Sequence, residues 1–183
     1  MSLPLSPEHY SAEEVARLLA LEPLDREGGF FRRVAESPLT LSGSALPSVI
    51  GGDRRAWSCI YMLLTPGGFS AMHRLVMEEI WFLVAGDQLE SLRLSPDGSG
   101  RWSRLGAEPT AGLYLHDVVP AHTWQGTRLV AGGRWALATL VVVPEFTWKD
   151  FEMGERAALT AAYPAFAADI AALTRVQPPA GSR

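Results

Sequence analysis

The chain has few of the residues that mark several common classes of protein. Only one of its 183 residues is a cysteine, Cys59, so no disulfide can form within the chain. Cys59 lies in the apolar run WSCIYMLL, which favours a small buried residue over a reactive thiol. No G-x-S-x-G pattern is present, which argues against a hydrolase of the nucleophile-elbow type.

Positive charge is also in short supply. The chain has 16 lysines and arginines against 20 aspartates and glutamates, a formal charge of −4. Nucleic acids and anionic membranes select basic surfaces, so neither is an expected partner. No apolar run is long enough to span a bilayer, and the start MSLPLSPEHY lacks the basic and apolar regions of a signal peptide. We therefore expect a cytoplasmic protein, whether or not Met1-Ser2-Leu3 is native.

Hydrophobic residues make up 48% of the chain, enough to build the core of a single domain. Ser11 and Glu14 have the spacing of a helix capping box, and an apolar stripe follows until Pro23 ends the helix. Helical patterns return at 154–162 and 166–173, before a Pro/Gly/Ser-rich tail. These patterns predict a helical arm over 1–20, one β-domain over 21–164, and a helix with a flexible tail over 165–183.

Between the helical ends, short apolar runs alternate with turn residues, which predicts a β-sandwich or β-barrel. The segment 38–52 has no clear periodicity and is expected to be a loop. The expected strands are 30–35, 56–65, 79–85, 88–94, 101–104, 113–119 and 135–143.

The stretch SAMHRLVMEEIWFLVAG, residues 70–86, carries a histidine and two glutamates in an apolar setting. If 79–85 is one strand, Glu79 shares a face with Trp81 and Leu83, whereas Glu78 points the other way. An unpaired carboxylate in a barrel interior would be costly. Glu79 should therefore bind a metal, pair with a cation such as Arg74, or hydrogen-bond a ligand.

Several motifs together resemble one known family. The pattern G-x4-H-R-x4-E-I-W-x4-G, from Gly68 to Gly86, resembles the first cupin motif, and VVPAHTWQG, from Val118 to Gly126, resembles the second. REGGFFRR, AWSCIYMLL and VVPEFTWKDFEMGERAAL, in this order, are similar to an uncharacterised cupin subfamily. The matches extend from about Leu21 to Pro164.

The resemblance implies an all-β double-stranded β-helix, the jelly-roll cupin barrel, with short helices at both termini and a ligand pocket inside. It also implies a homodimer. Most cupins hold a metal with three histidines and a glutamate. Here His73 and Glu79 match the first histidine and the glutamate, but the other two positions are Leu75 and Gln125. Gln125 could add a weak third ligand through its oxygen, so His73, Glu79 and Gln125 are the candidate metal ligands.

Two positions depart from the subfamily. His122 stands in the proline turn where the subfamily usually has glycine, and it is either an added pocket group or a surface residue. Phe82 replaces a histidine and should point away from Glu79, so this change should affect packing more than the pocket.

The candidate site residues each have a plainer alternative. His73 and Glu79 are a pocket pair with acid–base function, or else a core histidine and a structural ion pair. Trp81 is a pocket wall or plain core, and Phe146 either closes the pocket mouth or packs the exit segment against the barrel. His116, Asp117 and His122 are expected at the surface or rim. The remaining ligand-binding candidates are Gln125, Arg74 and Tyr61.

Two functions follow from this set. The first is binding of a small polar molecule, such as a sugar, a nucleotide or a small acid, inside the barrel. The second is an isomerase or epimerase of carbohydrate derivatives that uses His73 and Glu79 as its acid–base pair. No cofactor is required by the first function, and a weakly held divalent metal (Zn, Ni, Mn or Fe) is possible in the second.

Overall fold

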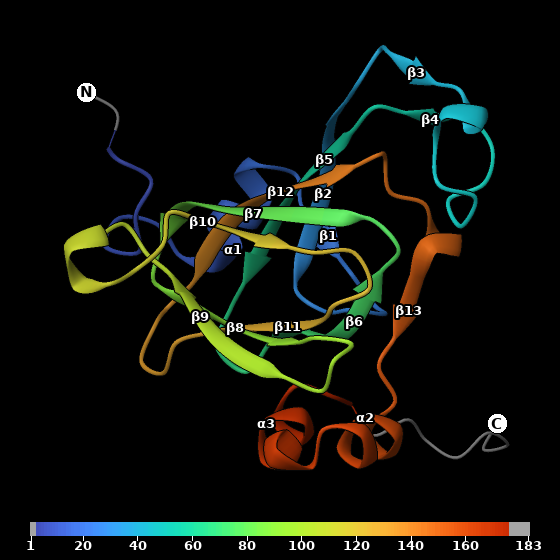
Figure 1. Cartoon of the computed structure of the whole chain (residues 1–183). Helices are drawn as coiled ribbons and strands as arrows, with labels where there is room; N and C mark the ends of the chain where they lie inside the picture. Colours follow the sequence, from blue (N-terminus) through green and yellow to red (C-terminus); the bar gives the residue numbers. More distant parts are fainter. Residues whose placement is uncertain (1–2, 176–183) are drawn as a thin grey trace, which may run out of the picture.

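The computed structural model describes residues 3–175 and has an all-β core with short helices at both ends (Figure 1). The predictions for Met1-Ser2 and for the tail 176–183 fall outside these residues. Within 3–175, no helix is long and apolar enough to cross a membrane. The strands are β1 (Glu22–Pro23), β2 (Phe30–Glu36), β3 (Thr40–Leu41), β4 (Arg54–Arg55), β5 (Ser58–Leu64), β6 (Phe69–Leu75), β7 (Glu78–Gly86), β8 (Leu89–Leu94), β9 (Gly100–Leu105), β10 (His116–Val119), β11 (Trp124–Leu129), β12 (Ala136–Val143) and β13 (Phe151–Met153), and the α-helices are α1 (Ala12–Leu18), α2 (Arg156–Ala162) and α3 (Ala167–Ala172).

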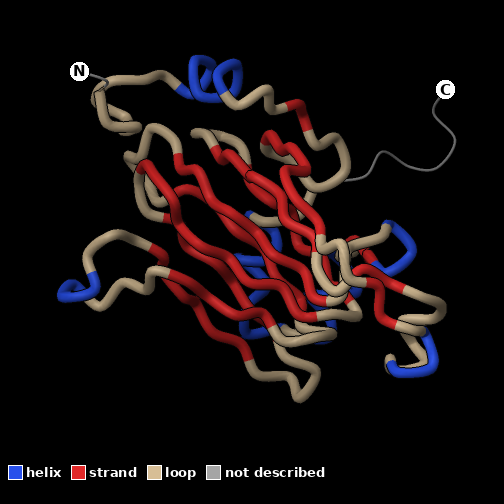
Figure 2. Tube along the Cα trace, turned by 90° about the horizontal axis from the view of Figure 1, so that it is seen from above, coloured by secondary structure: helices blue, strands red, loops and turns tan. Residues whose placement is uncertain are grey.

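Two antiparallel sheets face each other and enclose the core (Figures 1 and 2). We call the six-stranded sheet, of order β1-β2-β5-β12-β7-β10, the upper sheet, and the five-stranded sheet, of order β13-β6-β11-β8-β9, the lower sheet. The predicted jelly-roll barrel is therefore confirmed. The side chains packed between the sheets include Met62, Leu64, Trp81, Leu89, Leu105, Ala138 and Leu140.

Helices cover part of each sheet's outer face. On the upper sheet, α1 packs through Val15 against Leu63 and Leu137. The capping box at its start is present, because Ser11 and Glu14 bond to each other's backbone N–H groups. The C-terminal helices α2 and α3 lie under the lower sheet and bury a second apolar layer (Figure 1). The lower sheet is thus covered on both faces.

This double covering explains why β6 was not among the expected strands. Its inner face carries Ser70 and His73, and its outer face carries Met72, which packs on α2 and α3. Because both faces are buried, the polar–apolar alternation of a half-exposed strand is absent. The expected loop 38–52 was also wrong in part, since it contains β3, which pairs with β4, and a short 3₁₀ turn at Gly43–Ala45.

His122 occupies a turn conformation that favours glycine. Its φ is +63°, and its backbone N–H donates to the Leu75 carbonyl at 2.7 Å. Its side chain is exposed, so His122 is a surface residue and not a pocket group. The turn joins β10 to β11 and so determines where Gln125 enters the barrel.

We predict that His122→Gly raises the free energy of unfolding by about 0.5–1 kcal/mol, because a left-handed residue with a Cβ is strained. Chemical denaturation of the two proteins measures the difference. Ala121→Gly, in the same turn but without a positive φ, is the control and should lower the stability. Equal effects of the two substitutions would show that backbone strain at residue 122 is unimportant.

Candidate functional site

Four polar side chains meet inside the barrel at one level of the two sheets. On the lower sheet, Gln125 of β11 stands in register between His73 of β6 and Arg93 of β8. From the upper sheet, Glu79 of β7 reaches across to this row. All four side chains are at least nine-tenths buried. Their hydrogen-bonding partners must therefore come mainly from within the protein.

Glu79 receives two hydrogen bonds on the same oxygen. Trp81 Nε1 donates to Glu79 Oε2 at 2.9 Å, and Gln125 Nε2 donates to it at 2.6 Å. Among the described residues, Glu79 Oε1 takes part in no hydrogen bond. One oxygen of the carboxyl is therefore held in the network, and the other is left for a ligand.

His73 is held in one tautomer. Its Nδ1 lies 2.7 Å from the Ala71 carbonyl, which can only accept, so Nδ1 carries the proton. Nε2 then bears a lone pair and has no partner in the described part of the chain. The ring also stacks on Phe151, with 5.1 Å between the ring centroids, which fixes its plane.

Glu27 is a fourth acidic or basic group of the site, and it was not among the predicted site residues. The Glu27-Gly28-Gly29 turn has φ values of +105° and +77° at its glycines, and a Cβ at residue 28 would lie 2.4 Å from the Phe69 carbonyl oxygen. This close turn brings the Glu27 carboxyl inside, where it accepts from Ser70 and lies 3.9 Å from His73 Nδ1. The pair of glycines directly after Glu27 is the sequence signal that could have identified it.

Burial sets the protonation of these groups. Burial raises the pKa of Glu79, assisted by Glu27 and opposed by His73 and the two hydrogen bonds. It lowers the pKa of His73, although Glu79 acts in the opposite direction. Burial also raises the pKa of Glu27 to about 7, against the Ser70 hydrogen bond and the charge of Arg175. The site therefore tends toward neutral side chains, with a proton on a carboxyl and none on Nε2.

The two free polar atoms belong to residues that line a small cavity of about 60 Å³. Apart from Glu27, Ser58, His73 and Glu79, its walls are apolar and come from both sheets. Phe146, Trp148 and Phe151 form a cluster of edge-to-face rings on one side, so Phe146 is one of the lining residues. The remaining lining residues are Leu24, Phe31, Ile60, Leu75, Leu140 and Val142.

Comparisons with known proteins identify the family of this two-sheet barrel. The family model described as "Cupin superfamily (DUF985)" matches residues 13–154. The chain is a member of the cupin superfamily. A search of curated protein sequences finds no match.

Solved structures agree with this membership. A crystal structure of a protein from Shewanella oneidensis is 33% identical, with a TM-score of 0.80 over 92% of this cupin and 99% of that chain. A hypothetical protein from Leishmania major is 27% identical, with a TM-score of 0.81 over 91% of this cupin and 100% of that chain. A point mutant of Bacillus subtilis oxalate decarboxylase is 15% identical, with a TM-score of 0.50 over 94% of this cupin and 42% of that chain, and shares the fold alone.

Like Gln125, three further predicted site residues do not line the cavity of this cupin. Arg74 points to the outer face of β6, where it pairs with Glu152 at 2.6 Å and lies over the Trp124 ring. Tyr61 packs beside α1 on the outer face of the upper sheet, because it stands next to inward-facing Ile60 and Met62 on β5. Trp81 is fully buried and donates a hydrogen bond to Glu79, but it does not form part of the cavity wall. Phe82 is exposed and faces away from Glu79, as predicted.

Asp117 corrects another expectation. It was expected at the rim, yet it is only 8% exposed and lies 3.1 Å from Arg93 Nη2. Ser103 donates to it at 2.6 Å. Burial alone would raise the pKa of Asp117, but Arg93, Ser103 and Arg101 together hold it below its usual range. His116, its neighbour on β10, is exposed as predicted.

The donor set does not fit the metal site that the cupin fold implies. Structural and catalytic metal sites use at least three strong ligands. Within residues 3–175, no group of three or more His, Cys, Asp or Glu side chains is arranged to hold a metal. Leu75 is apolar, and the Gln125 oxygen accepts hydrogen bonds from Trp81 and Arg93 at 3.2 and 3.1 Å. Only His73 and Glu79 of the predicted set remain available.

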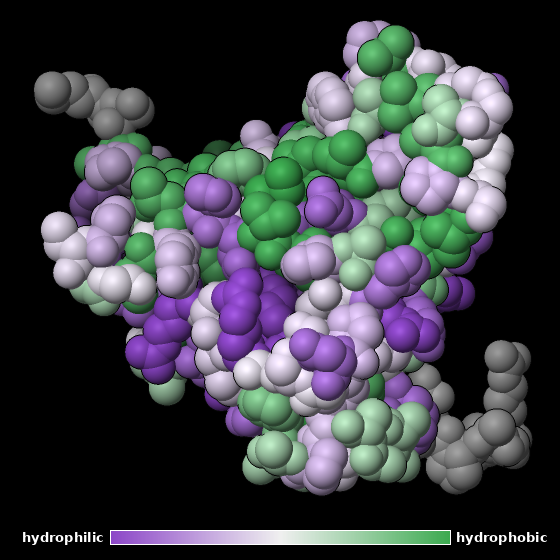
Figure 3. All heavy atoms as spheres, in the orientation of Figure 1, coloured by the Kyte–Doolittle hydropathy of each residue, from purple (hydrophilic) through white to green (hydrophobic). Residues whose placement is uncertain are grey.

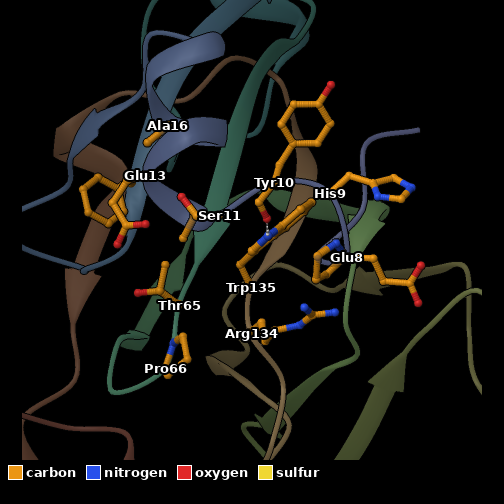
Figure 4. A pocket seen from close by; sticks show the side chains of 13 residues that line it. Glu8, His9, Tyr10, Ser11, Glu13, Ala16, Thr65, Pro66, Arg134 and Trp135 are labelled. Carbon is orange, nitrogen blue, oxygen red and sulfur yellow. Dashed lines mark hydrogen bonds between the residues drawn. The ribbon is translucent and has the colours of Figure 1, made fainter. Parts of the chain in front are cut away.

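A larger hollow of about 800 Å³ lies outside the barrel, between the segment before α1 and the turn before β12 (Figure 4). Trp135 Nε1 donates to the Tyr10 carbonyl there at 2.8 Å, which ties the N-terminal segment to the barrel. None of the predicted site residues lines this hollow. The candidate site is therefore the smaller interior cavity.

We predict that Glu27 makes the stability of this cupin fall as pH rises. Its pKa is about 7 when folded, above the ordinary value of 4.5, so the stabilising contribution is present below about pH 4.5 and is lost as pH rises through 7. The loss should not exceed roughly 3.5 kcal/mol, at about 1.4 kcal/mol for each unit of pKa difference. Urea unfolding between pH 4.5 and 8 measures it. Glu27→Gln should flatten the profile, whereas Glu22→Gln, at an exposed position, should leave it unchanged.

Proposed function

We propose that this cupin binds a small molecule inside the barrel, with the polar end of the molecule on His73 and Glu79. The observation that supports this most is the pairing of two unoccupied polar atoms, His73 Nε2 and Glu79 Oε1, on residues that line the same cavity. Neither atom is one of the fully enclosed side-chain atoms without a partner, so both are accessible, and a ligand that bonds to both would gain hydrogen bonds.

The cavity favours the smallest of the ligand classes considered. A cavity of about 60 Å³ can hold a molecule of a few non-hydrogen atoms, but it is too small for a nucleotide. A neutral Glu79 offers a proton, and His73 Nε2 accepts one. A small organic acid bound in its uncharged form matches this pair, because the carbonyl oxygen of its carboxyl group accepts from Glu79 and the hydroxyl of that group donates to His73. The apolar walls would hold a short hydrocarbon body.

A second candidate, an isomerase or epimerase, is favoured by the same tautomer. His73 presents an unprotonated nitrogen, and the raised pKa of Glu79 makes it a proton donor. A base and an acid in one cavity can remove a proton from a carbon next to a carbonyl and return one to the same or a neighbouring atom. Bound molecules that are converted to an isomer would establish this function over simple binding.

We also propose that a second copy of the chain covers the open part of the upper sheet. Val118, Ile80 and Val141 stand in one register row across β10, β7 and β12 on the outer face, and Phe82 stands in the next row. A solvated face of an antiparallel sheet is normally polar. Figure 3 shows apolar residues gathered where β7 comes to the front of the molecule. The exposed large apolar residues of this region are Phe82, Val84, Val118 and Val143.

We predict that His73→Ala and Glu79→Ala each abolish or weaken by at least about tenfold the binding of small organic acids, since each removes one hydrogen-bonding partner in a buried site. A thermal-shift screen of acids with two to five carbons, followed by calorimetry on each hit, measures the affinity. Each hit is then tested for conversion to an isomer.

Glu78→Gln is the matched control, because Glu78 is the exposed neighbour of Glu79 on β7. It should bind each hit with unchanged affinity. The proposal fails if no acid stabilises the wild-type protein, or if the hits bind His73→Ala and Glu79→Ala as tightly as wild type.

We predict that Val118→Glu converts a dimer into a monomer, because a charge in a packed apolar interface is strongly destabilising. Light scattering after size-exclusion chromatography measures the mass. Val84→Glu tests how far the interface extends along β7. A wild-type protein that is monomeric at high concentration would contradict the proposed dimer.

A further inference from the structure

The orientation of the Gln125 side chain decides what the cavity offers. Its Nε2 donates to Glu79 Oε2 at 2.6 Å, and its Oε1 accepts from Arg93 Nη1 at 3.1 Å and from Trp81 Nε1 at 3.2 Å. The amide thus lies between a carboxyl on one side and a guanidinium on the other. Its oxygen is on the guanidinium side, away from His73.

Rotating the Gln125 amide group by half a turn would replace favourable contacts with unfavourable ones, both at Arg93 and at Glu79. Arginine carries only donors, so a flip would place the Gln125 NH₂ group against the Arg93 N–H groups. It would also remove the Gln125 donor from Glu79 Oε2 and leave a carbonyl oxygen beside it. The charge of Arg93 makes this preference strong, because a charge-assisted hydrogen bond is about twice as strong as a neutral one.

Arg93 is itself held in place. It is 2% exposed, and Asp117 Oδ2 lies 3.1 Å from its Nη2. Ser103 and Arg101 bind the same aspartate, at 2.6 and 3.3 Å. Burial lowers the pKa of Arg93 to about 10, against the charges of Asp117 and Glu79, so the guanidinium remains charged at neutral pH. The donor that faces Gln125 is therefore permanent.

We infer that Arg93 is a positioning residue: it locks the Gln125 amide so that the Gln125 oxygen points away from the cavity and Glu79 presents only Oε1. Arg93 thereby withholds the oxygen that would be the third ligand of a metal beside His73 and Glu79. This inference deepens the proposed function, because a site held in this way selects a hydrogen-bonding ligand over a cation. It assigns a role to the pair of Arg93 and Asp117, which line no part of the cavity.

The test removes the lock and measures metal binding. Arg93→Met with Asp117→Asn deletes the guanidinium and its counter-charge together, so no unpaired charge is buried. The freed Gln125 amide can then turn its oxygen toward His73 and Glu79. We expect Co²⁺, followed by its visible absorption and by calorimetry, to bind at least about tenfold more tightly than to wild type, as expected for the gain of one ligand.

Two controls separate positioning from a general loosening of the barrel. Adding Gln125→Leu to the double variant should abolish the gain, because it removes the oxygen. Arg93→Lys keeps a charged donor and should bind Co²⁺ as weakly as wild type. The inference is overturned if the folded double variant binds Co²⁺ no better than wild type, or if Arg93→Lys gains as much.

A measurement on the wild-type chain covers the case in which the double variant does not fold. In nitrogen-15 NMR spectra, the Gln125 side-chain proton donated to Glu79 should be shifted downfield and protected from exchange. Both properties should disappear in Glu79→Ala. An unprotected Gln125 NH₂ group in the wild-type protein would overturn the inference. Neither readout uses an organic ligand, so failure of the acid screen would contradict the proposed function and leave this test intact.

Discussion

A carboxyl group between two β-sheets must have hydrogen-bonding partners, and the interior of this protein is organised around that requirement. Glu79 is one of the few acidic groups in the core, and it receives Trp81 from its own strand and Gln125 from the opposite sheet. The cost of leaving such a group unpaired is several kcal/mol, a large part of the stability of a typical domain. Gln125 and Trp81 are therefore structural residues as much as site residues.

The same requirement extends through the barrel. The amide oxygen of Gln125 is buried as well and needs a donor, and Arg93 and Trp81 provide it. Arg93 in turn needs Asp117, which Ser103 and Arg101 hold. A polar row thus runs from the cavity to the rim through both sheets. Because each member of this row depends on the next, we expect a substitution of Asp117 to alter the polar groups of the cavity, although Asp117 is not a lining residue.

The cavity itself is a product of what the apolar residues leave open. Leu75 stands where most cupins have a histidine, and the aromatic cluster of Phe146, Trp148 and Phe151 narrows the space further. The remaining cavity is small and mostly apolar, and its ionisable side chains tend toward their neutral forms. These properties suit an uncharged hydrogen-bonding group better than a metal ion, in contrast with the ligand set predicted by analogy with other cupins.

Much of the fold could be predicted from the sequence, because it depends on local patterns. The alternating apolar runs, the capping box at Ser11 and the paired glycines after Glu27 each act over a few residues. Strand alternation alone was enough to place Glu79 inside and Phe82 outside. The tertiary structure decided the rest. Both faces of β6 are buried, so its pattern was hidden. Arg74 and Tyr61 proved to face outward, and Asp117 inward. The pairing of Arg93 with Gln125 joins residues 32 positions apart, and the direction of one amide follows from that contact together with those to Trp81 and Glu79.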